Sequence, residues 1–358
     1  MKKILIATGG SGGHVIPSLS IYDALKDNFE VKISTDFRGS KFINNDNYNY
    51  SLIDVPNVFS NLLLFPYNLI KFCVSTIKSY KYLKLNNFNI LITTGGYMSL
   101  PLCIASNLLN IKIYLFETNL ILGRANKFIL NFADKIICYE ENLTGISKKF
   151  LNKIYLVKPL LRKEIYKYNK NEKTIITEKK KILIIGGSQG AKFFDEFITK
   201  IIIKLSKIEK IQVLQQVINV NKGKNIKELY QKNHIEHELF HFDDKVLLKA
   251  LNYDLAITRS GASVISELGY LNIPFVAIPY PYAKDNHQYY NAEFYEKNKS
   301  CWLIMQKDLE ENNFTDFIIK IFKDQNEYFV KKNNLIQLTK ENTWEKNKFK
   351  LIELLNEN

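Results

Sequence analysis

Short apolar runs alternate with longer amphipathic segments along this chain. The first half contains the runs KILIAT, VKIST, ILITT, KIYLFE and KIICYE, with segments long enough for helices between them. Apolar runs of this length predict strands that are buried on both faces of a parallel sheet, and the alternation predicts repeated βαβ units. The pattern therefore predicts an α/β fold.

The pattern begins again at KKKILIIGGSQGA, where a strand and a glycine turn precede a helix that starts near Lys192. The runs IQVLQQV, DLAITRSGAS and PFVAIPYP continue it. Two similar halves predict two Rossmann-like domains, with a polar linker over 167–180 and a boundary between Val157 and Lys181. We expect domains at residues 1–160 and 161–340, followed by a terminal segment at 341–358.

Composition narrows the class of protein. The chain has 358 residues, which is enough for two cores, and its formal net charge of +14 indicates an anionic partner, although Lys is abundant throughout the chain. The N-terminal apolar run is too short for a signal peptide. The most apolar stretch, LLLFPYNLIKFCVSTI, is interrupted by Pro66, Asn68 and Lys71, so no spanning helix is expected. The cysteines have neither zinc-site nor disulfide-framework spacing, which suits a reducing cytosol: Cys73, Cys103, Cys138 and Cys301.

Four glycine-rich turns follow predicted strands: TGGSGGH, TTGGYMSLP, IGGSQGA and TRSGASVISE. In a parallel sheet such turns lie at the carboxyl ends of the strands, where ligands bind. Glycine lets the backbone approach a ligand, and a following helix directs N–H groups at an anion. A single turn of this kind can simply need flexibility. Four of them together favour a ligand that contains phosphate.

Two nucleotide-binding patterns are absent. The dinucleotide fingerprint fails because Val15 stands where a third glycine is needed after Gly10 and Gly12. None of the glycine turns ends in the GK[ST] of a Walker A loop. Asp36 could imitate the ribose-binding acid of a dinucleotide fold, but an ordinary strand-end residue is the simpler interpretation. The chain has no D-x-D motif, and its histidines lack metal-ligand spacing, so no metal site is expected.

His14 makes the first turn unusual. A histidine at the start of a helix meets the positive end of the helix dipole, which disfavours the imidazolium form. A neutral imidazole beside a ligand-binding turn is a candidate general base, and a histidine that only packs the turn is the alternative.

The motifs GGSGGHVIP, TTGGYMSLP, IGGSQGA, TRSGASVISELG and KDNHQYYNA occur together in one order. Over residues 2–292 the chain thereby resembles the N-acetylglucosaminyltransferases of glycosyltransferase family 28 that act on peptidoglycan precursors. The resemblance implies a GT-B architecture, in which two Rossmann-like domains with parallel sheets face a deep cleft and the last helix crosses back to the first domain. It also implies inverting transfer of N-acetylglucosamine from UDP-N-acetylglucosamine to the 4-hydroxyl of undecaprenyl-pyrophosphoryl-N-acetylmuramyl-pentapeptide, without a cofactor.

The resemblance implies that the first half binds the acceptor and the second half binds the donor. It implies that His14 is the base, with Glu117 next in line, and that Ser11, Gly12 and Gly13 contact the substrates. In the second half Ser188 would bond to the diphosphate, and the backbone of Phe242 would meet uracil.

The resemblance implies further donor contacts in the second half. Glu267 would accept hydrogen bonds from the ribose, and Gln288 would bond to the donor sugar with Asn291 beside it. The segment that would line the nucleoside consists of Ala262, Ser263, Val264, Ile265, Ser266 and Glu267.

Three segments depart from the family pattern. FETN stands at 116–119 where the family usually has HEQN, so only Glu117 and Asn119 are carried over. KPLLR at 158–162 replaces GNPVR, which leaves Arg162 as the arginine on the phosphate side. His287 replaces the first of two glutamines.

An acceptor with a polyprenyl chain stays in the membrane, so the enzyme needs a docking surface. The segment from Tyr67 predicts a helix with a broad apolar face, opposite Lys71 and Lys78, with Lys81 and Lys84 at its end. The residues expected on this face are Tyr67, Leu69, Phe72, Cys73, Ile77, Tyr80 and Leu83, and Leu62, Leu63, Leu64 and Phe65 are expected to form an inserting loop. An ordinary helix packed on the sheet explains the apolar face equally well.

The partners expected are therefore UDP-N-acetylglucosamine, the lipid-linked acceptor and an anionic membrane surface, at the cytoplasmic face of the plasma (inner) membrane. No nucleic acid is expected, and association with other wall-building proteins is left open. Two alternatives remain: another GT-B transferase with a lipid acceptor, and a non-catalytic subunit that binds a nucleotide sugar.

Overall fold

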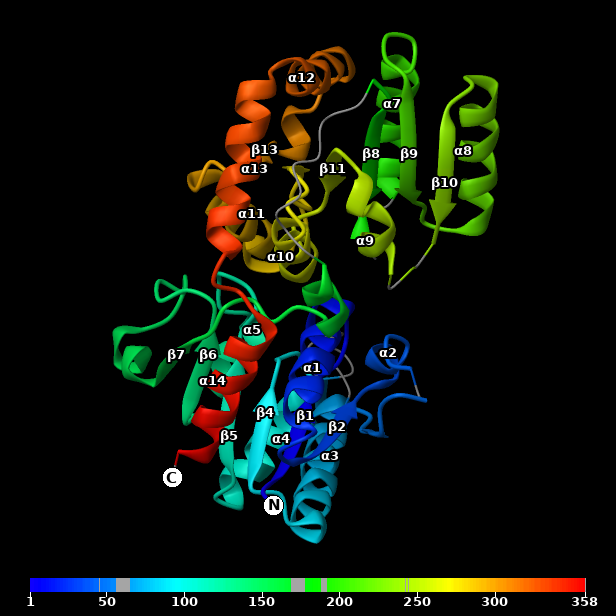
Figure 1. Ribbon diagram of the computed structural model, residues 1–358. Helices are drawn as coiled ribbons and strands as arrows, with labels where there is room; N and C mark the ends of the chain where they lie inside the picture. Colours follow the sequence, from blue (N-terminus) through cyan, green and yellow to red (C-terminus); the bar gives the residue numbers. More distant parts are fainter. Residues whose placement is uncertain are drawn as a thin grey trace. The chain divides into compact units, whose positions relative to one another are not determined.

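The computed structural model describes residues 1–44, 46–55, 65–168, 178–187, 192–241, 243 and 245–357, and it contains two compact units (Figure 1). The first unit comprises residues 1–166 and 342–358, and the second comprises residues 167–341. The chain leaves the first unit near Tyr166 and returns to it at Asn342.

The first unit is built on a parallel sheet of seven strands in the order β3-β2-β1-β4-β5-β6-β7. The strands are β1 (Lys3–Ala7), β2 (Glu30–Thr35), β3 (Tyr50–Leu52), β4 (Ile90–Thr93), β5 (Lys112–Phe116), β6 (Lys135–Cys138) and β7 (Ile154–Leu156). The helices are α1 (Gly12–Leu25), α2 (Phe37–Ser40), α3 (Phe65–Asn86), α4 (Ser99–Leu108), α5 (Arg124–Ile129), η2 (Lys148–Lys153), η3 (Lys163–Lys167) and α14 (Trp344–Asn356).

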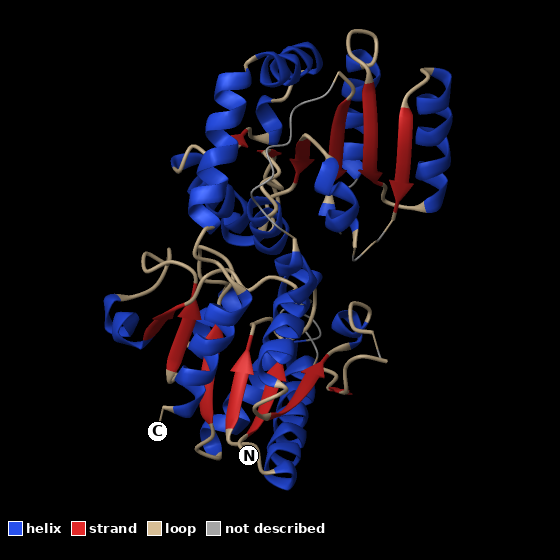
Figure 2. Ribbon diagram, viewed as in Figure 1, coloured by secondary structure: helices blue, strands red, loops and turns tan. Residues whose placement is uncertain are grey.

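Helices cover both faces of this sheet (Figure 2), and the side chains of the two faces enter two different cores. Ile4 and Ile6 of β1 share one core with side chains of α1 and α14, whereas Leu5 and Ala7 share the other with α3, α4 and α5. Successive side chains of a strand point to opposite faces, so a strand that is covered on both sides must be apolar throughout. This double burial explains the uninterrupted apolar runs and confirms the predicted α/β fold.

The second unit is built on a parallel sheet of six strands in the order β10-β9-β8-β11-β12-β13. The strands are β8 (Lys180–Ile185), β9 (Ile211–Gln216), β10 (Glu236–Phe240), β11 (Leu255–Thr258), β12 (Phe275–Ala277) and β13 (Trp302–Leu303). The helices are η4 (Phe194–Ile198), α7 (Thr199–Leu205), α8 (Val220–Lys232), α9 (Val246–Lys249), η5 (Ala250–Asn252), α10 (Ala262–Tyr270), η6 (Lys284–Asn286), α11 (His287–Lys297), η7 (Gln306–Asp308), α12 (Glu311–Lys323) and α13 (Gln325–Thr339).

Helix α14 packs into the first unit although it follows the second unit in sequence. Trp344, Leu351 and Leu355 are buried in the core beside α1, and the ammonium of Lys2 donates to the carbonyl oxygen of Leu355 at 2.8 Å. The helix begins after Thr343, whose side chain accepts a hydrogen bond from the backbone N–H of Lys346. The last helix is therefore part of the first unit's hydrophobic core.

Helix α3 corrects one sequence prediction. Its buried side chains are Asn68, Ser75, Ser79 and Leu83. The helix packs against α4, and Ser75 Oγ donates to the Asp54 carbonyl at 2.9 Å. The small serine side chains let the helix approach its neighbours closely. Leu83 and, in part, Phe72 and Tyr80 of the predicted apolar face are thus turned inward, whereas Tyr67, Leu69 and Ile77 of that face are exposed.

The lysines of α3 also lie differently from the prediction. They do not face away from the exposed apolar residues, since the Lys71 ammonium lies 4.5 Å from the centre of the exposed Tyr67 ring. The exposed surface of α3 combines apolar residues with lysines: Tyr67, Leu69, Ile70, Val74, Ile77, Lys71, Lys78, Lys81 and Lys84. Leu62, Leu63 and Leu64 lie outside the described residues.

The strand order reverses at the same place in both sheets. β1 lies between β2 and β4, and β8 lies between β9 and β11, so connections leave each central strand in both directions. In open parallel sheets a crevice forms at this point, outside the carboxyl ends of the strands, and ligands bind there. A ligand-binding site is therefore expected at the turns after β1, β4, β8 and β11.

Candidate functional site

His14 lies where the first sheet reverses its strand order. It is the third residue of α1, and its Nδ1 atom lies 2.8 Å from the carbonyl oxygen of Thr94, the residue after β4. A carbonyl can only accept, so Nδ1 carries the proton, and in the neutral tautomer with this proton Nε2 carries the lone pair. Thr94 is itself fixed, because its hydroxyl donates to Thr8 Oγ1 at 2.8 Å.

The turn after β4 is shaped by two glycines with positive φ, Gly95 (+93°) and Gly96 (+88°). A Cβ on Gly96 would lie 3.2 Å from the carbonyl oxygen of Gly9 and 3.8 Å from Cδ2 of His14. Residues other than glycine rarely adopt this conformation. The close approach of the two glycine turns therefore depends on Gly96, which sits directly beside the imidazole.

Glu117 holds the next turn together. Glu117 is 1% exposed, and its two carboxylate oxygens accept four hydrogen bonds. Oε1 accepts from the backbone and side-chain amides of Asn119 at 3.0 Å, and Oε2 accepts from Gly123 N at 3.1 Å and Asn126 Nδ2 at 2.6 Å. This arrangement favours a positioning residue over the alternative base that sequence reasoning assigned to Glu117.

Asn126 connects Glu117 to the glycine turn. Its side-chain amide lies against Gly95, where an added Cβ would collide with it. The sequence did not single out Asn126, and no motif signals it, because its role depends on three turns that meet only in the fold. Glu117 thereby supports Gly95, which adjoins the Thr94 carbonyl that orients His14.

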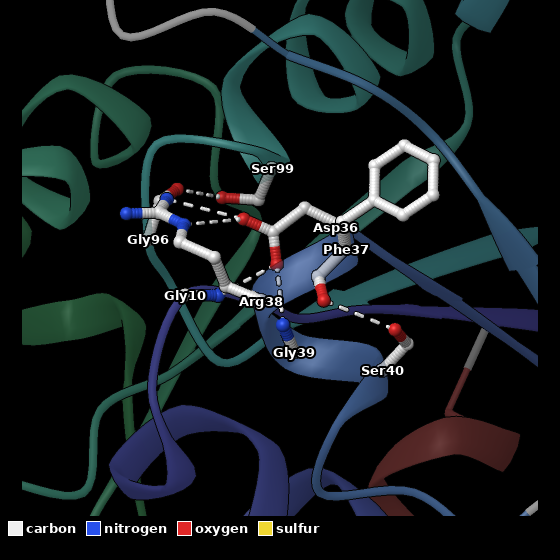
Figure 3. A network of polar contacts seen from close by, with 8 residues as sticks. All are labelled: Gly10, Asp36, Phe37, Arg38, Gly39, Ser40, Gly96 and Ser99. Atoms are coloured by element: carbon white, nitrogen blue, oxygen red, sulfur yellow. Dashed lines mark hydrogen bonds and ion pairs between the residues drawn. The ribbon is translucent and has the colours of Figure 1, made fainter. Parts of the chain in front are cut away.

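Asp36 is a further organising residue rather than an ordinary strand-end residue (Figure 3). It follows β2, and its Oδ1 accepts from Gly10 N at 2.9 Å and from Gly39 N at 2.8 Å. Its Oδ2 accepts from Nε and Nη2 of Arg38 at 3.2 and 3.1 Å. One carboxylate thus fastens the first glycine turn, caps α2 and orients an arginine.

The remaining predicted residues of the first unit lie at several places. Ser11 is the N-cap of α1 and makes no side-chain capping bond, and Gly12 and Gly13 open the helix beside His14. The side-chain amide of Asn119 donates a hydrogen bond to Glu117. Arg162 is half-buried between β7 and η3, away in sequence from the glycine turns.

In the second unit the turn after β8 reaches a left-handed residue, Gly187 (φ +68°). Its N–H donates to Oε1 of Gln216 at 2.9 Å, and Nε2 of Gln216 donates to the carbonyl of His241 at 3.2 Å. Gln216, at the end of β9, thus ties the glycine turn to the segment after β10. Ser188 and Phe242, predicted to meet the diphosphate and uracil, lie outside the described residues.

The turn after β11 is held by α11. Oε1 of Gln288 accepts from Ser260 N at 3.3 Å and from Tyr280 N at 2.9 Å, and Asn291 Nδ2 donates to the Ser260 carbonyl at 3.2 Å. The amide oxygen of Gln288 is therefore used within the fold, which leaves a donating role toward a sugar for its amide nitrogen.

The predicted nucleoside segment is only partly accessible. Gly261 is the N-cap of α10 without a side-chain cap, and Ala262, Ser263 and Val264 in its first turn are partly exposed. Ile265, Ser266 and Glu267 are buried. A ligand at this helix N-terminus would therefore meet the backbone N–H groups of the first turn before it meets Glu267.

Arg259 is a buried residue that sequence reasoning missed, although it stands inside the TRSGAS turn. Its Nη1 donates to the carbonyls of Ile278 and Pro279 at 3.0 Å, Nη2 donates to Gln306 Oε1 at 2.6 Å, and the guanidinium lies 4.7 Å from the Phe194 ring. Burial lowers the pKa of Arg259 to about 10. This side chain joins the ends of β11 and β12 to the helix after the β8 turn.

Among the residues that the structure describes, no group of three or more His, Cys, Asp or Glu side chains could hold a metal ion. No described helix is long and apolar enough to cross a membrane. All four cysteines are free thiols, and only Cys73 is exposed.

Comparison with family models covers most of the chain. The glycosyltransferase family 28 N-terminal domain matches residues 4–138, and the glycosyltransferase family 28 C-terminal domain matches residues 181–350. Both matches include the glycine turns and the residues that fasten them.

Curated relatives match over the full length. A protein of Pelagibacter ubique (strain HTCC1062), named UDP-N-acetylglucosamine--N-acetylmuramyl-(pentapeptide) pyrophosphoryl-undecaprenol N-acetylglucosamine transferase, is 46% identical over 100% of this chain and 99% of its own length. A Rickettsia canadensis (strain McKiel) protein of the same name is 32% identical over 95% of this chain and 96% of its own length.

Solved structures match the fold. The crystal structure of Acinetobacter baumannii MurG has a TM-score of 0.75 at 19% identity and covers 99% of both chains. The S. aureus MnaA-UDP co-structure has a TM-score of 0.66 at 15% identity, over 93% of this chain and 91% of the other. At these identities the similarity supports the predicted GT-B fold class.

Proposed function

The chain belongs to glycosyltransferase family 28, and from this membership we propose that it transfers N-acetylglucosamine from UDP-N-acetylglucosamine to the 4-hydroxyl of undecaprenyl-pyrophosphoryl-N-acetylmuramyl-pentapeptide, with inversion at the anomeric carbon. The observation that carries the proposal is the 46% identity to the Pelagibacter ubique relative over the whole chain. That relative's name states both the donor sugar and the acceptor.

His14 is the proposed general base. Its Nδ1–H is held by the Thr94 carbonyl, so Nε2 accepts the proton of the 4-hydroxyl as that oxygen attacks the anomeric carbon. The carbonyl also stabilises the imidazolium that forms, because it accepts from the same Nδ1–H. A positioned base of this kind contributes about 10²- to 10⁴-fold to the rate.

The second unit is proposed to hold the donor. Backbone N–H groups at the start of α10 are suited to a diphosphate, whose negative charge grows as UDP departs. Ser188, which follows Gly187 in sequence, is proposed to bond to the same diphosphate. Arg162 is proposed as a further contact on the phosphate side. The Gln288 amide nitrogen would donate to the sugar, the Phe242 backbone would meet uracil, and Glu267 would accept from the ribose.

The acceptor half is proposed to dock on a membrane. The exposed side of α3 carries Ile70, Val74 and Ile77, which are 64%, 45% and 58% exposed, among four exposed lysines. Apolar side chains enter the interface and lysines attract anionic lipid headgroups. We therefore propose a peripheral position at the cytoplasmic face of the plasma membrane, where the lipid-linked acceptor is reached.

The test is UDP release from UDP-N-acetylglucosamine by the purified protein, with and without a short-chain analogue of the acceptor. Acceptor-dependent release, with one β-1,4-linked disaccharide product per UDP, is the expected result. UDP-sugar binding without release under either condition would contradict a transferase and favour a non-catalytic binding subunit. Release with a different glycolipid acceptor alone would change the substrate.

A further inference from the structure

Besides Asp36, a second charged residue, Arg38, lies beside the first glycine turn. Asp36 is buried, with a side chain that is 9% exposed, whereas the side chain of Arg38 is 66% exposed. The two residues are joined by two hydrogen bonds, from Nε and Nη2 of the guanidinium to one carboxylate oxygen. The buried partner thus holds an exposed guanidinium in a fixed place (Figure 3).

That place is next to Gly10. A Cβ on Gly10 would lie 3.7 Å from Nη2 of Arg38, and the N–H of Gly10 donates to the same Asp36 side chain. The preceding residue, Gly9, carries the carbonyl oxygen that approaches Gly96, the neighbour of His14. Arg38 and His14 therefore border the same glycine turn.

Because the Arg38 guanidinium is mostly exposed to solvent, its attraction to Asp36 is screened, and Asp36 also accepts from the backbone N–H groups of Gly10 and Gly39. Stability therefore gives a weak reason for the presence of Arg38. A guanidinium has more N–H groups than the two that Asp36 accepts, and its planar fork matches the oxygens of a phosphate. An arginine that a carboxylate already holds in place has less conformational freedom to lose when it binds an anion, so the entropic cost of binding is smaller. These properties suit a binding residue for a phosphorylated ligand.

We infer that Arg38, held by Asp36, binds the diphosphate of the lipid-linked acceptor. This inference rests on the proposed function, in which the acceptor's hydroxyl meets His14. The diphosphate is attached to the anomeric carbon of the same sugar, across the ring from the 4-hydroxyl. When that hydroxyl is at His14, the diphosphate lies one sugar ring away from the imidazole, and Arg38, which borders the same turn beside Gly10, supplies positive charge on that side.

The test compares Arg38→Gln with the wild type on two acceptors, the short-chain diphosphate analogue and the corresponding methyl glycoside, which has no phosphate. Arg38→Gln is expected to raise the KM for the diphosphate acceptor about 10- to 100-fold, as the loss of a hydrogen bond to a charged group does. The KM for UDP-N-acetylglucosamine stays unchanged, and the two proteins are equal on the methyl glycoside. Arg38→Lys keeps the charge without the fork and gives an intermediate KM.

Lys41→Gln is the matched control, because Lys41 is exposed at the end of the same short helix and its loss changes the net charge equally. It should behave as wild type on both acceptors. An equal loss by Arg38→Gln on both acceptors would overturn the inference. The inference would also be overturned if Arg38→Gln raised the KM for the donor and weakened UDP binding but left the acceptor KM normal. In that case Arg38 would bind the diphosphate of the donor.

A binding measurement separates this inference from the proposed function. Titration calorimetry with farnesyl diphosphate in detergent requires no turnover, and Arg38→Gln should bind it about tenfold more weakly or worse than the wild type. Arg38-dependent binding without any transfer by the wild type would refute the proposed function alone. Transfer by the wild type with normal kinetics and normal farnesyl diphosphate binding in Arg38→Gln would refute this inference alone.

Discussion

The Nδ1 atom of His14 lies 2.8 Å from the carbonyl oxygen of Thr94, although 80 positions separate the two residues in the sequence. β1 and β4 are neighbours in the sheet, and each ends in a glycine turn. The contact therefore exists because the strand order reverses between these two strands. It fixes both the tautomer and the direction of the imidazole.

His14→Ala removes the proposed base and should lower kcat by about 10²- to 10⁴-fold. The affinity for UDP should stay unchanged, because His14 is not among the groups that are proposed to bind UDP. His14→Gln keeps a side chain that can donate to the Thr94 carbonyl but cannot take a proton, so it should be as inactive as the alanine variant. Single-turnover rates and UDP titration check both points. Near-normal turnover in either variant would show that another group is the base.

Gly96→Ala tests whether the turn geometry supports catalysis. Gly145 provides a matched control, since it also has a positive φ (+86°), but its nearest neighbour is the flexible Lys127 side chain at 3.6 Å. Both alanine variants should lose about 1–2 kcal/mol of unfolding free energy, because the left-handed conformation is strained for alanine.

The two glycine variants should differ in turnover. Only Gly96→Ala crowds Gly9 and His14, so it alone should lower kcat, by about 10- to 100-fold, as misplacement of a catalytic group does. Trp344 fluorescence in a Trp302→Phe background reports unfolding of the first unit, and UDP release reports turnover. Equal activity of the two variants would mean that the contact beside His14 does not matter to the reaction.

The sheets could be predicted from the sequence because double burial is a local pattern: Ile4, Leu5 and Ile6 are all apolar since each face of β1 is covered. The glycine turns and His14 could also be placed, because they directly follow such strands. The Thr94 contact could not, since it depends on which strands become neighbours. Periodicity likewise could not show which face of α3 is buried, because Ser75 and Ser79 face the unit together with Leu83, whereas Ile70, Val74 and Ile77 are exposed.

Glu117→Gln distinguishes a positioning residue from a base. Glutamine has one accepting oxygen, so two of the four donors that meet Glu117 lose their partner, at about 1–3 kcal/mol for each buried donor. The unfolding free energy of the first unit should therefore fall together with kcat. Glu141→Gln, at an exposed carboxylate, should change neither. A fall in kcat with unchanged stability would instead give Glu117 a direct part in proton transfer.

The burial of Asp195 leads us to expect that the stability of the second unit depends on pH. The residue is buried, its Oδ2 accepts from Ile218 N at 3.0 Å, and burial raises the pKa of its carboxyl. Between the unfolded and the native pKa the unfolded state binds fewer protons, so this group lowers the unfolding free energy as pH rises through that window. Asp195→Asn removes the effect.

The stability of Asp195→Asn relative to the wild type should therefore increase from acidic to neutral pH and then level off. The chain has two tryptophans, Trp302 in the second unit and Trp344 in the first. Urea unfolding followed by fluorescence in a Trp344→Phe background reports the second unit alone. A difference between the two proteins that does not change with pH would contradict the raised pKa.

Ser substitution of Ile70, Val74 and Ile77 together tests the membrane surface of α3. Their side chains are exposed, so the fold should be unaffected, while binding to vesicles of phosphatidylglycerol and phosphatidylethanolamine should fall because apolar side chains no longer enter the interface. Ile208→Ser with Val220→Ser is the control, since these residues are equally exposed but belong to the second unit.

Gln substitution of the α3 lysines tests the electrostatic part of the same surface. Each lysine near an anionic surface is worth about 1 kcal/mol, so each loss should weaken vesicle binding about fivefold, and the effect should disappear in high salt or on vesicles without phosphatidylglycerol. The lysines are Lys71, Lys78, Lys81 and Lys84. Turnover of a water-soluble acceptor should be unchanged, because α3 is remote in sequence from His14 and contributes none of the turns around it. If the lysine and serine variants bind vesicles as tightly as the wild type, the exposed face of α3 is not the docking surface, and the membrane contact must be made by another part of the chain.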